Sequence, residues 1–106
     1  MSIKIKKFDS LWFNITAELT DFDPNWDNWS GKWTIVSELG GSVLLTGSIT
    51  KLPDLGHFIT QVPTANIGTL NPGTYFCCPE ISNTSIDFRK ELQPQKFVVS
   101  EQNVPV

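Results

Sequence analysis

The residues best suited to chemistry or binding lie in one irregular segment of the chain, residues 21–31. Four of its oxygen-bearing side chains stand at alternate positions: Asp21, Asp23, Asn25 and Asp27. Ca²⁺ often takes oxygen ligands at such a spacing, but an EF-hand loop also needs a glycine at its sixth position and a carboxylate at its twelfth. This segment has Trp26 and Lys32 at those two positions. We therefore interpret it as a polar turn whose Asp and Asn side chains cap their own backbone, with no metal.

The same segment holds two tryptophans on either side of a carboxylate and an amide. Exposed indoles in such a setting could stack on a sugar ring, or anchor a protein interface, where Trp carries much of the binding energy. A third interpretation is that both indoles fold back and close the end of the domain. The sequence leaves these three open. The candidate partner-binding set is four consecutive residues: Trp26, Asp27, Asn28 and Trp29.

No catalytic residues and no cofactor are predicted. His57 is the single histidine, and no nucleophile elbow or other catalytic signature accompanies it. Cys77 and Cys78 are adjacent, without the CxxC spacing of redox sites. Neighbouring side chains of a strand point to opposite faces, so we expect two reduced thiols, one facing the core and one facing out. The pattern favours a protein that is not an enzyme.

The elements that position these residues are predicted to be strands. Apolar residues alternate with mostly polar ones over residues 11–19, as in a long half-buried strand: Leu11, Phe13, Ile15, Ala17 and Leu19. A Gly40-Gly41 pair predicts a tight hairpin turn into a returning strand over residues 43–50, with Val43, Leu45 and Ile49 on one face. Gly47 inside that strand indicates a bulge or a close approach of the backbone. Shorter strands are predicted around residues 3–5, 33–35, 57–62, 74–82, 86–92 and 97–100, with one helical turn after residue 63.

Seven or eight short strands without a helical period predict an all-β fold, an immunoglobulin-like antiparallel β-sandwich. The 106 residues suit a single domain over 1–106, with extended arms at residues 1–7 and 101–106. A net charge of −3 without a basic stripe argues against nucleic acid as a partner. Apolar runs are too short to span a membrane, and no secretory signal pattern follows Met1. We therefore expect synthesis and folding in a cytoplasm.

The order of these elements resembles that of a known family. FDSLWFNITAELTDFD opens with a strand, LNPGTY leads into a late strand, and IDFRKELQPQKFVV ends the domain. This order is similar to that of the small immunoglobulin-like domains of tailed-bacteriophage virions, such as the N-terminal domain of baseplate upper proteins. The Trp-rich acidic segment departs from the family pattern, which has a shorter turn there.

The resemblance implies a virion structural protein, an accessory or decoration subunit that docks on the capsid or tail. Its partners would be other virion proteins, and copies of itself where the particle is symmetric. The alternative comes from a different class: a carbohydrate-binding module that uses the Trp-rich acidic segment, with a glycan as ligand.

Overall fold

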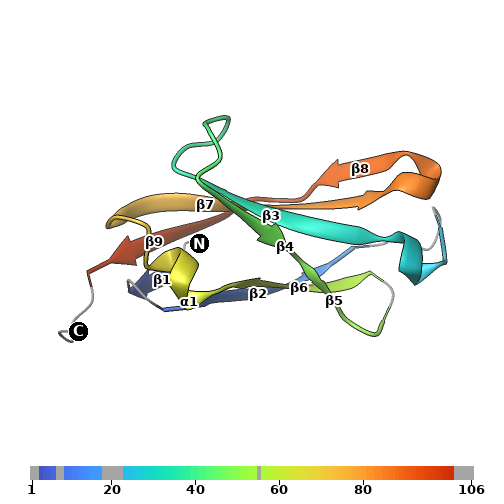
Figure 1. The fold of residues 1–106 in the computed structure, drawn as a ribbon, viewed down its shortest axis with the longest axis horizontal. Coiled ribbons are helices and arrows are strands. Elements are labelled where there is room, and N and C mark those ends of the chain that lie inside the picture. The colour runs from blue at the N-terminus through green and yellow to red at the C-terminus, as the bar shows by residue number, and fades with distance from the viewer. Residues whose placement is uncertain (1–2, 7–8, 18–22, 55, 102–106) are drawn as a thin grey trace.

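Two β-sheets packed face to face form this computed structural model, which describes residues 3–6, 9–17, 23–54 and 56–101 (Figure 1). The larger sheet has the strand order β1 (Ile3–Lys6), β9 (Gln95–Ser100), β7 (Gly73–Asn83), β3 (Ser30–Val36) and β4 (Leu45–Ser48). A further strand, β8 (Phe88–Glu91), also pairs with β7. The smaller sheet has the order β2 (Leu11–Thr16), β6 (His57–Val62) and β5 (Thr50–Lys51).

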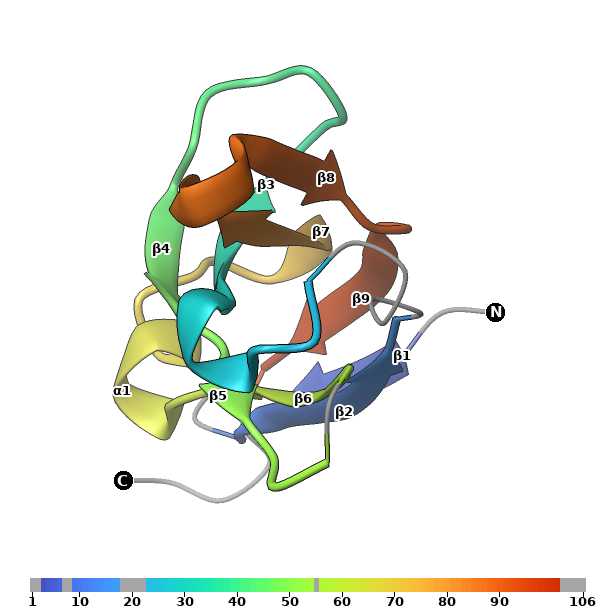
Figure 2. The ribbon, with the colours of Figure 1, turned by 90° about the vertical axis from the view of Figure 1, so that its right-hand side faces the viewer.

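The prediction of an all-β, immunoglobulin-like sandwich is confirmed. Three strands, β2-β6-β5, face the sheet that contains β4-β3-β7-β9, as the two sheets of an immunoglobulin domain face each other (Figure 2). The described residues hold nine strands rather than seven or eight. The short helical elements are α1 (Thr64–Ile67), at the turn predicted after residue 63, and two 3₁₀ turns, η1 (Trp26–Asn28) and η2 (Thr84–Ile86).

One strand pair is parallel, where the sequence predicts an antiparallel sandwich. β1 pairs in parallel with β9, with Ile3 opposite Phe97 and Lys6 opposite Ser100. Residues 3–6 of the predicted N-terminal arm therefore belong to the larger sheet. Residues 1–2, 7 and 102–106 of the two predicted arms lie outside the described residues, as do Leu19 and Asp21.

The predicted strand over residues 43–50 is wrong in its bounds, whereas its hairpin pairing with the preceding strand is confirmed, because β4 pairs antiparallel with β3. Residues 37–44 form a loop instead of a two-residue turn, and β4 begins only at Leu45. At Ile49, whose N–H donates to the Gly31 carbonyl at 2.9 Å, the chain leaves the larger sheet and enters the smaller one as β5. The side chain of Ile49 is buried at this crossing.

A break separates β8 from β9 along the same edge of β7. Residues 78 and 79 lie between the pairs Cys77–Gln95 and Glu80–Glu91, and three residues, 92 to 94, face them. Leu92 donates its N–H to the Pro79 carbonyl at 2.9 Å, and Pro79 has no N–H to return. A proline inside a sheet is tolerated at a bulge, which is where Pro79 stands.

The core lies between the sheets and is made of the inward side chains of both. Trp33, 2% exposed, is a core residue as predicted, and its indole lies directly over Gly47 of the neighbouring strand. A Cβ at Gly47 would lie 2.4 Å from Cζ2 of that ring. The prediction of a close approach at Gly47 is thus confirmed, with the indole as the approaching group.

Candidate functional site

The acidic segment is organised around the carboxylate of Asp23. One oxygen accepts the backbone N–H of Asn25 at 3.0 Å. The other accepts the side-chain amides of Asn28 and of buried Asn83, both at 2.9 Å. These hydrogen bonds, the one from Asn28 first, hold the pKa of Asp23 below its ordinary value of 3.8. Asp23 therefore ties the segment to the far end of β7.

Both tryptophans of the segment fold back onto the sandwich. Trp29 is 1% exposed, donates its Nε1–H to the Asp23 carbonyl at 2.9 Å, and meets Phe88 edge to face at 5.4 Å between ring centroids. Trp26 is half-buried, donates Nε1–H to the Leu52 carbonyl at 2.7 Å, and meets Phe58 edge to face at 5.0 Å. These contacts agree with the third interpretation, in which both indoles fold back and close the end of the domain.

The four candidate residues therefore do not form a single cluster. Asn28 and Trp29 meet at Asp23, while Trp26 packs separately against the smaller sheet. Asp27 is exposed, and its backbone N–H donates to the Asn25 side chain, which caps η1. Stacking on a sugar needs an open indole face, which buried Trp29 does not offer. Partner binding by this set stays a prediction, and Asp27 is its exposed part.

Sequence reasoning missed a loop elsewhere that exposes apolar side chains. Three side chains of the β3–β4 loop are largely exposed: Leu39 by 59%, Val43 by 57% and Leu44 by 48%. The loop stands away from the larger sheet in both views, and the Leu44 N–H donates to the Ile35 carbonyl at 2.8 Å at its base (Figures 1 and 2). A shallow hollow of about 250 Å³ lies beside it, lined by Leu44, Leu70 and Tyr75 among others. We call Leu39, Val43 and Leu44 the apolar loop.

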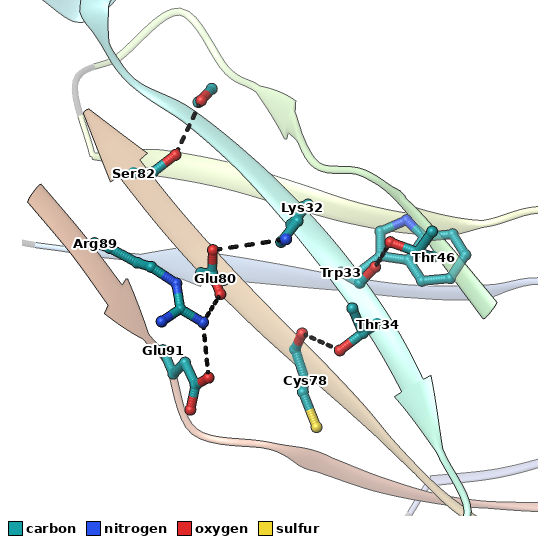
Figure 3. Close-up of polar contacts among 10 residues, drawn as sticks. Lys32, Trp33, Thr34, Thr46, Cys78, Glu80, Ser82, Arg89 and Glu91 are labelled. Carbon is teal, nitrogen blue, oxygen red and sulfur yellow. Dashed lines mark hydrogen bonds and ion pairs between the residues drawn. The ribbon is translucent and has the colours of Figure 1, made fainter. Parts of the chain in front are cut away.

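The outer face of the larger sheet carries charges that are paired with one another (Figure 3). Arg89 lies 2.7 Å from Glu80 and 3.2 Å from Glu91, and Lys32 lies 4.0 Å from Glu80. The hydrogen bond from Arg89 holds the pKa of Glu80 below its ordinary value of 4.5. Arg89 and Glu91 both belong to β8, and Glu80 comes from the neighbouring strand β7. Both carboxylates of this cluster, Glu80 and Glu91, are therefore ion-paired with Arg89.

The residues considered for catalysis lie in different sheets, with His57 in the smaller sheet and both cysteines in the larger one. His57 is exposed at the start of β6. Cys77 faces the core, where burial raises the pKa of its thiol to about 12, and Cys78 is half-buried on the opposite face, as predicted. Within the described ranges, no group of three or more His, Cys, Asp or Glu side chains is placed to hold a metal ion. No helix among the described residues is long and apolar enough to cross a membrane.

Comparison with known proteins adds no family. The chain matches no model of a protein family, and no curated protein matches it.

Proposed function

We propose that this protein is a non-enzymatic assembly subunit of a tailed-bacteriophage virion, an accessory protein that docks on neighbouring capsid or tail proteins. The observation that carries the proposal is the apolar loop, which presents three large aliphatic side chains to solvent on a projecting loop. Exposed apolar groups gathered in one place mark interaction sites on proteins of this size. The virion setting is supported by the resemblance in element order described above.

The apolar loop is suited to a contact that binds weakly on its own and gains affinity when many copies bind at once. Full burial of a leucine or valine contributes about 1.5–3 kcal/mol. Since the three side chains are about half exposed, covering them contributes roughly 2–4 kcal/mol before the cost of association. A contact of that size holds a subunit only when many copies engage at once, as on a symmetric particle.

Incorporation into particles tests the proposal. We would place the triple substitution Leu39→Ser, Val43→Ser and Leu44→Ser in the genome that encodes the chain. Quantitative mass spectrometry of purified particles then gives copies per particle. We expect the unaltered protein to be present at a fixed copy number and the triple variant to be lost by at least tenfold, while the isolated variant stays folded.

Ile86→Ser is the matched control, because Ile86 is also an exposed aliphatic residue, by 41%, but lies in η2. It should leave the copy number unchanged. Absence of the unaltered protein from purified particles would overturn the virion proposal. Full incorporation of the triple variant would overturn the role of the apolar loop.

A further inference from the structure

Among the strands that the structure describes, β2 pairs only with β6, so its other edge has no paired strand. β2 and β6 pair with Leu11 opposite Val62 and Thr16 opposite His57, and the Ala17 N–H donates to the Gly56 carbonyl at 2.8 Å. Hydrogen-bonded positions alternate in an antiparallel pair, so the odd-numbered residues of β2 bond to β6. The backbone groups of Trp12, Asn14 and Thr16 therefore point away from it, and no bond to them is found among the described residues.

The inner face of β2 is also incompletely covered. Phe13 and Ile15 point inward but are only half-buried, whereas Phe58 and Thr60, opposite them on β6, are fully buried. A groove of about 230 Å³ opens beside them. Its far wall is made by Pro79, Leu92, Gln93 and Gln95, at the break between β8 and β9.

Exposure of Trp12 is an independent sign on the same edge. Its side chain is 60% exposed on the outer face of β2, the largest exposed fraction among the exposed apolar side chains of the described residues. Trp is rich in contact area and is enriched where proteins bind one another. The open backbone, the half-covered inner face and the exposed indole thus coincide on one strand.

The groove and the strand beside it are uncharged. Neither the groove's lining nor β2 itself, Leu-Trp-Phe-Asn-Ile-Thr, contains a charged side chain. A segment that pairs with this edge and fills the groove should therefore be extended, with uncharged, apolar side chains at alternate positions. β2 of a second copy meets that description.

We propose that two copies of this chain pair through β2, antiparallel about a twofold axis at Asn14. Asn14 then lies opposite Asn14 of the second copy. Trp12 lies opposite Thr16 of the second copy, and Phe13 lies opposite Ile15 of the second copy. Each of the three even-numbered positions exchanges two backbone hydrogen bonds, about six in all. The two smaller sheets become one continuous sheet, and each copy's inward Phe13 and Ile15 cover the groove of the other.

Cysteine pairing tests the register. Directly opposite residues of a hydrogen-bonded antiparallel pair have Cα atoms about 5.5 Å apart, within reach of a disulfide. Asn14→Cys should give a covalent dimer under mild oxidation, seen on a non-reducing gel. Thr16→Cys is the matched control, because the twofold places Thr16 opposite Trp12 and not opposite itself. It also controls for the native thiols, and a mixture of Thr16→Cys with Trp12→Cys should cross-link again.

Solution mass tests the dimer without any disulfide. Light scattering should show the unaltered chain shifting from monomer toward dimer as its concentration rises. Asn14→Pro should stay at least tenfold more monomeric, while circular dichroism remains that of the parent, because the Asn14 N–H makes no bond to β6. A chain that stays monomeric at millimolar concentration, or equal cross-linking of Asn14→Cys and Thr16→Cys, would overturn the proposal.

Discussion

Replacing Gly47 by alanine should destabilise the sandwich by about 1–2 kcal/mol, because the added methyl group collides with a core indole. A Cβ at this position would lie 2.4 Å from Cζ2, 2.6 Å from Cε2 and 2.9 Å from Nε1 of Trp33. Carbon atoms pack best about 3.5–4.0 Å apart, so the ring or the strand must move by about 1 Å. Trp33 is 2% exposed and has little room to yield.

The magnitude follows from two opposing terms. Forcing a methyl group into a packed core typically costs about 1–3 kcal/mol. Replacing glycine restricts the unfolded chain and returns about 0.4–1 kcal/mol. The net loss of about 1–2 kcal/mol corresponds to a fall in the melting temperature on the order of 5–15 °C for a domain of this size.

Urea unfolding followed by tryptophan fluorescence measures the effect. Ser48→Ala, on the same strand but facing solvent, is the control and should change the unfolding free energy by less than about 0.5 kcal/mol. In a Trp33→Phe background the fused ring that meets the methyl group is gone, so Gly47→Ala should then be nearly neutral. The reasoning is refuted if Gly47→Ala matches the parent, or if its full cost persists in the Trp33→Phe background.

Three further changes test other parts of the structure. Thr60→Val should raise stability by roughly 1 kcal/mol in urea unfolding, because this buried hydroxyl has no hydrogen-bond partner among the described residues; an unchanged midpoint would contradict this. Asp23→Asn should lower the urea midpoint at pH 7. Because the folded pKa of Asp23 is depressed, its contribution is present above pH 3.8 and lost as pH falls through the folded value, so the variant should lose less on acidification, and parallel profiles would refute the role of the carboxylate. Iodoacetamide at pH 8 should modify Cys77 only after unfolding, and mass spectrometry showing rapid labelling of the native thiol would count against its raised pKa.

Alternation along the chain predicted the strands that have one buried face. The pattern beginning at Leu11 located β2, and the predicted strand over residues 57–62 coincides with β6. Cys77 and Cys78 occupy opposite faces for the same reason, since a period of two is a local property of the backbone. Such features need no knowledge of distant partners.

Features that depend on contacts between distant segments could not be predicted from alternation along the sequence. The sequence pattern predicts Val43 on the same strand face as Leu45 and Ile49, yet Val43 lies in a loop and is 57% exposed. Trp29 donates to the Asp23 carbonyl, and the Asp23 carboxylate accepts the side-chain amide of Asn83, which lies 60 residues further along the chain. The parallel pairing of β1 with β9 likewise joins the two ends of the described chain, and no local pattern encodes it.

That parallel pairing determines how the domain would respond to tension. Force applied through the residues before Ile3 and after Ser100 pulls β1 and β9 in opposite directions along their axes, because the two strands run the same way. Their hydrogen bonds are then loaded in shear, together, and cannot open one after another as they would in an antiparallel pair pulled from one end. A domain tethered at both ends would resist extension through the β1–β9 pair before force acted on the rest of the sandwich.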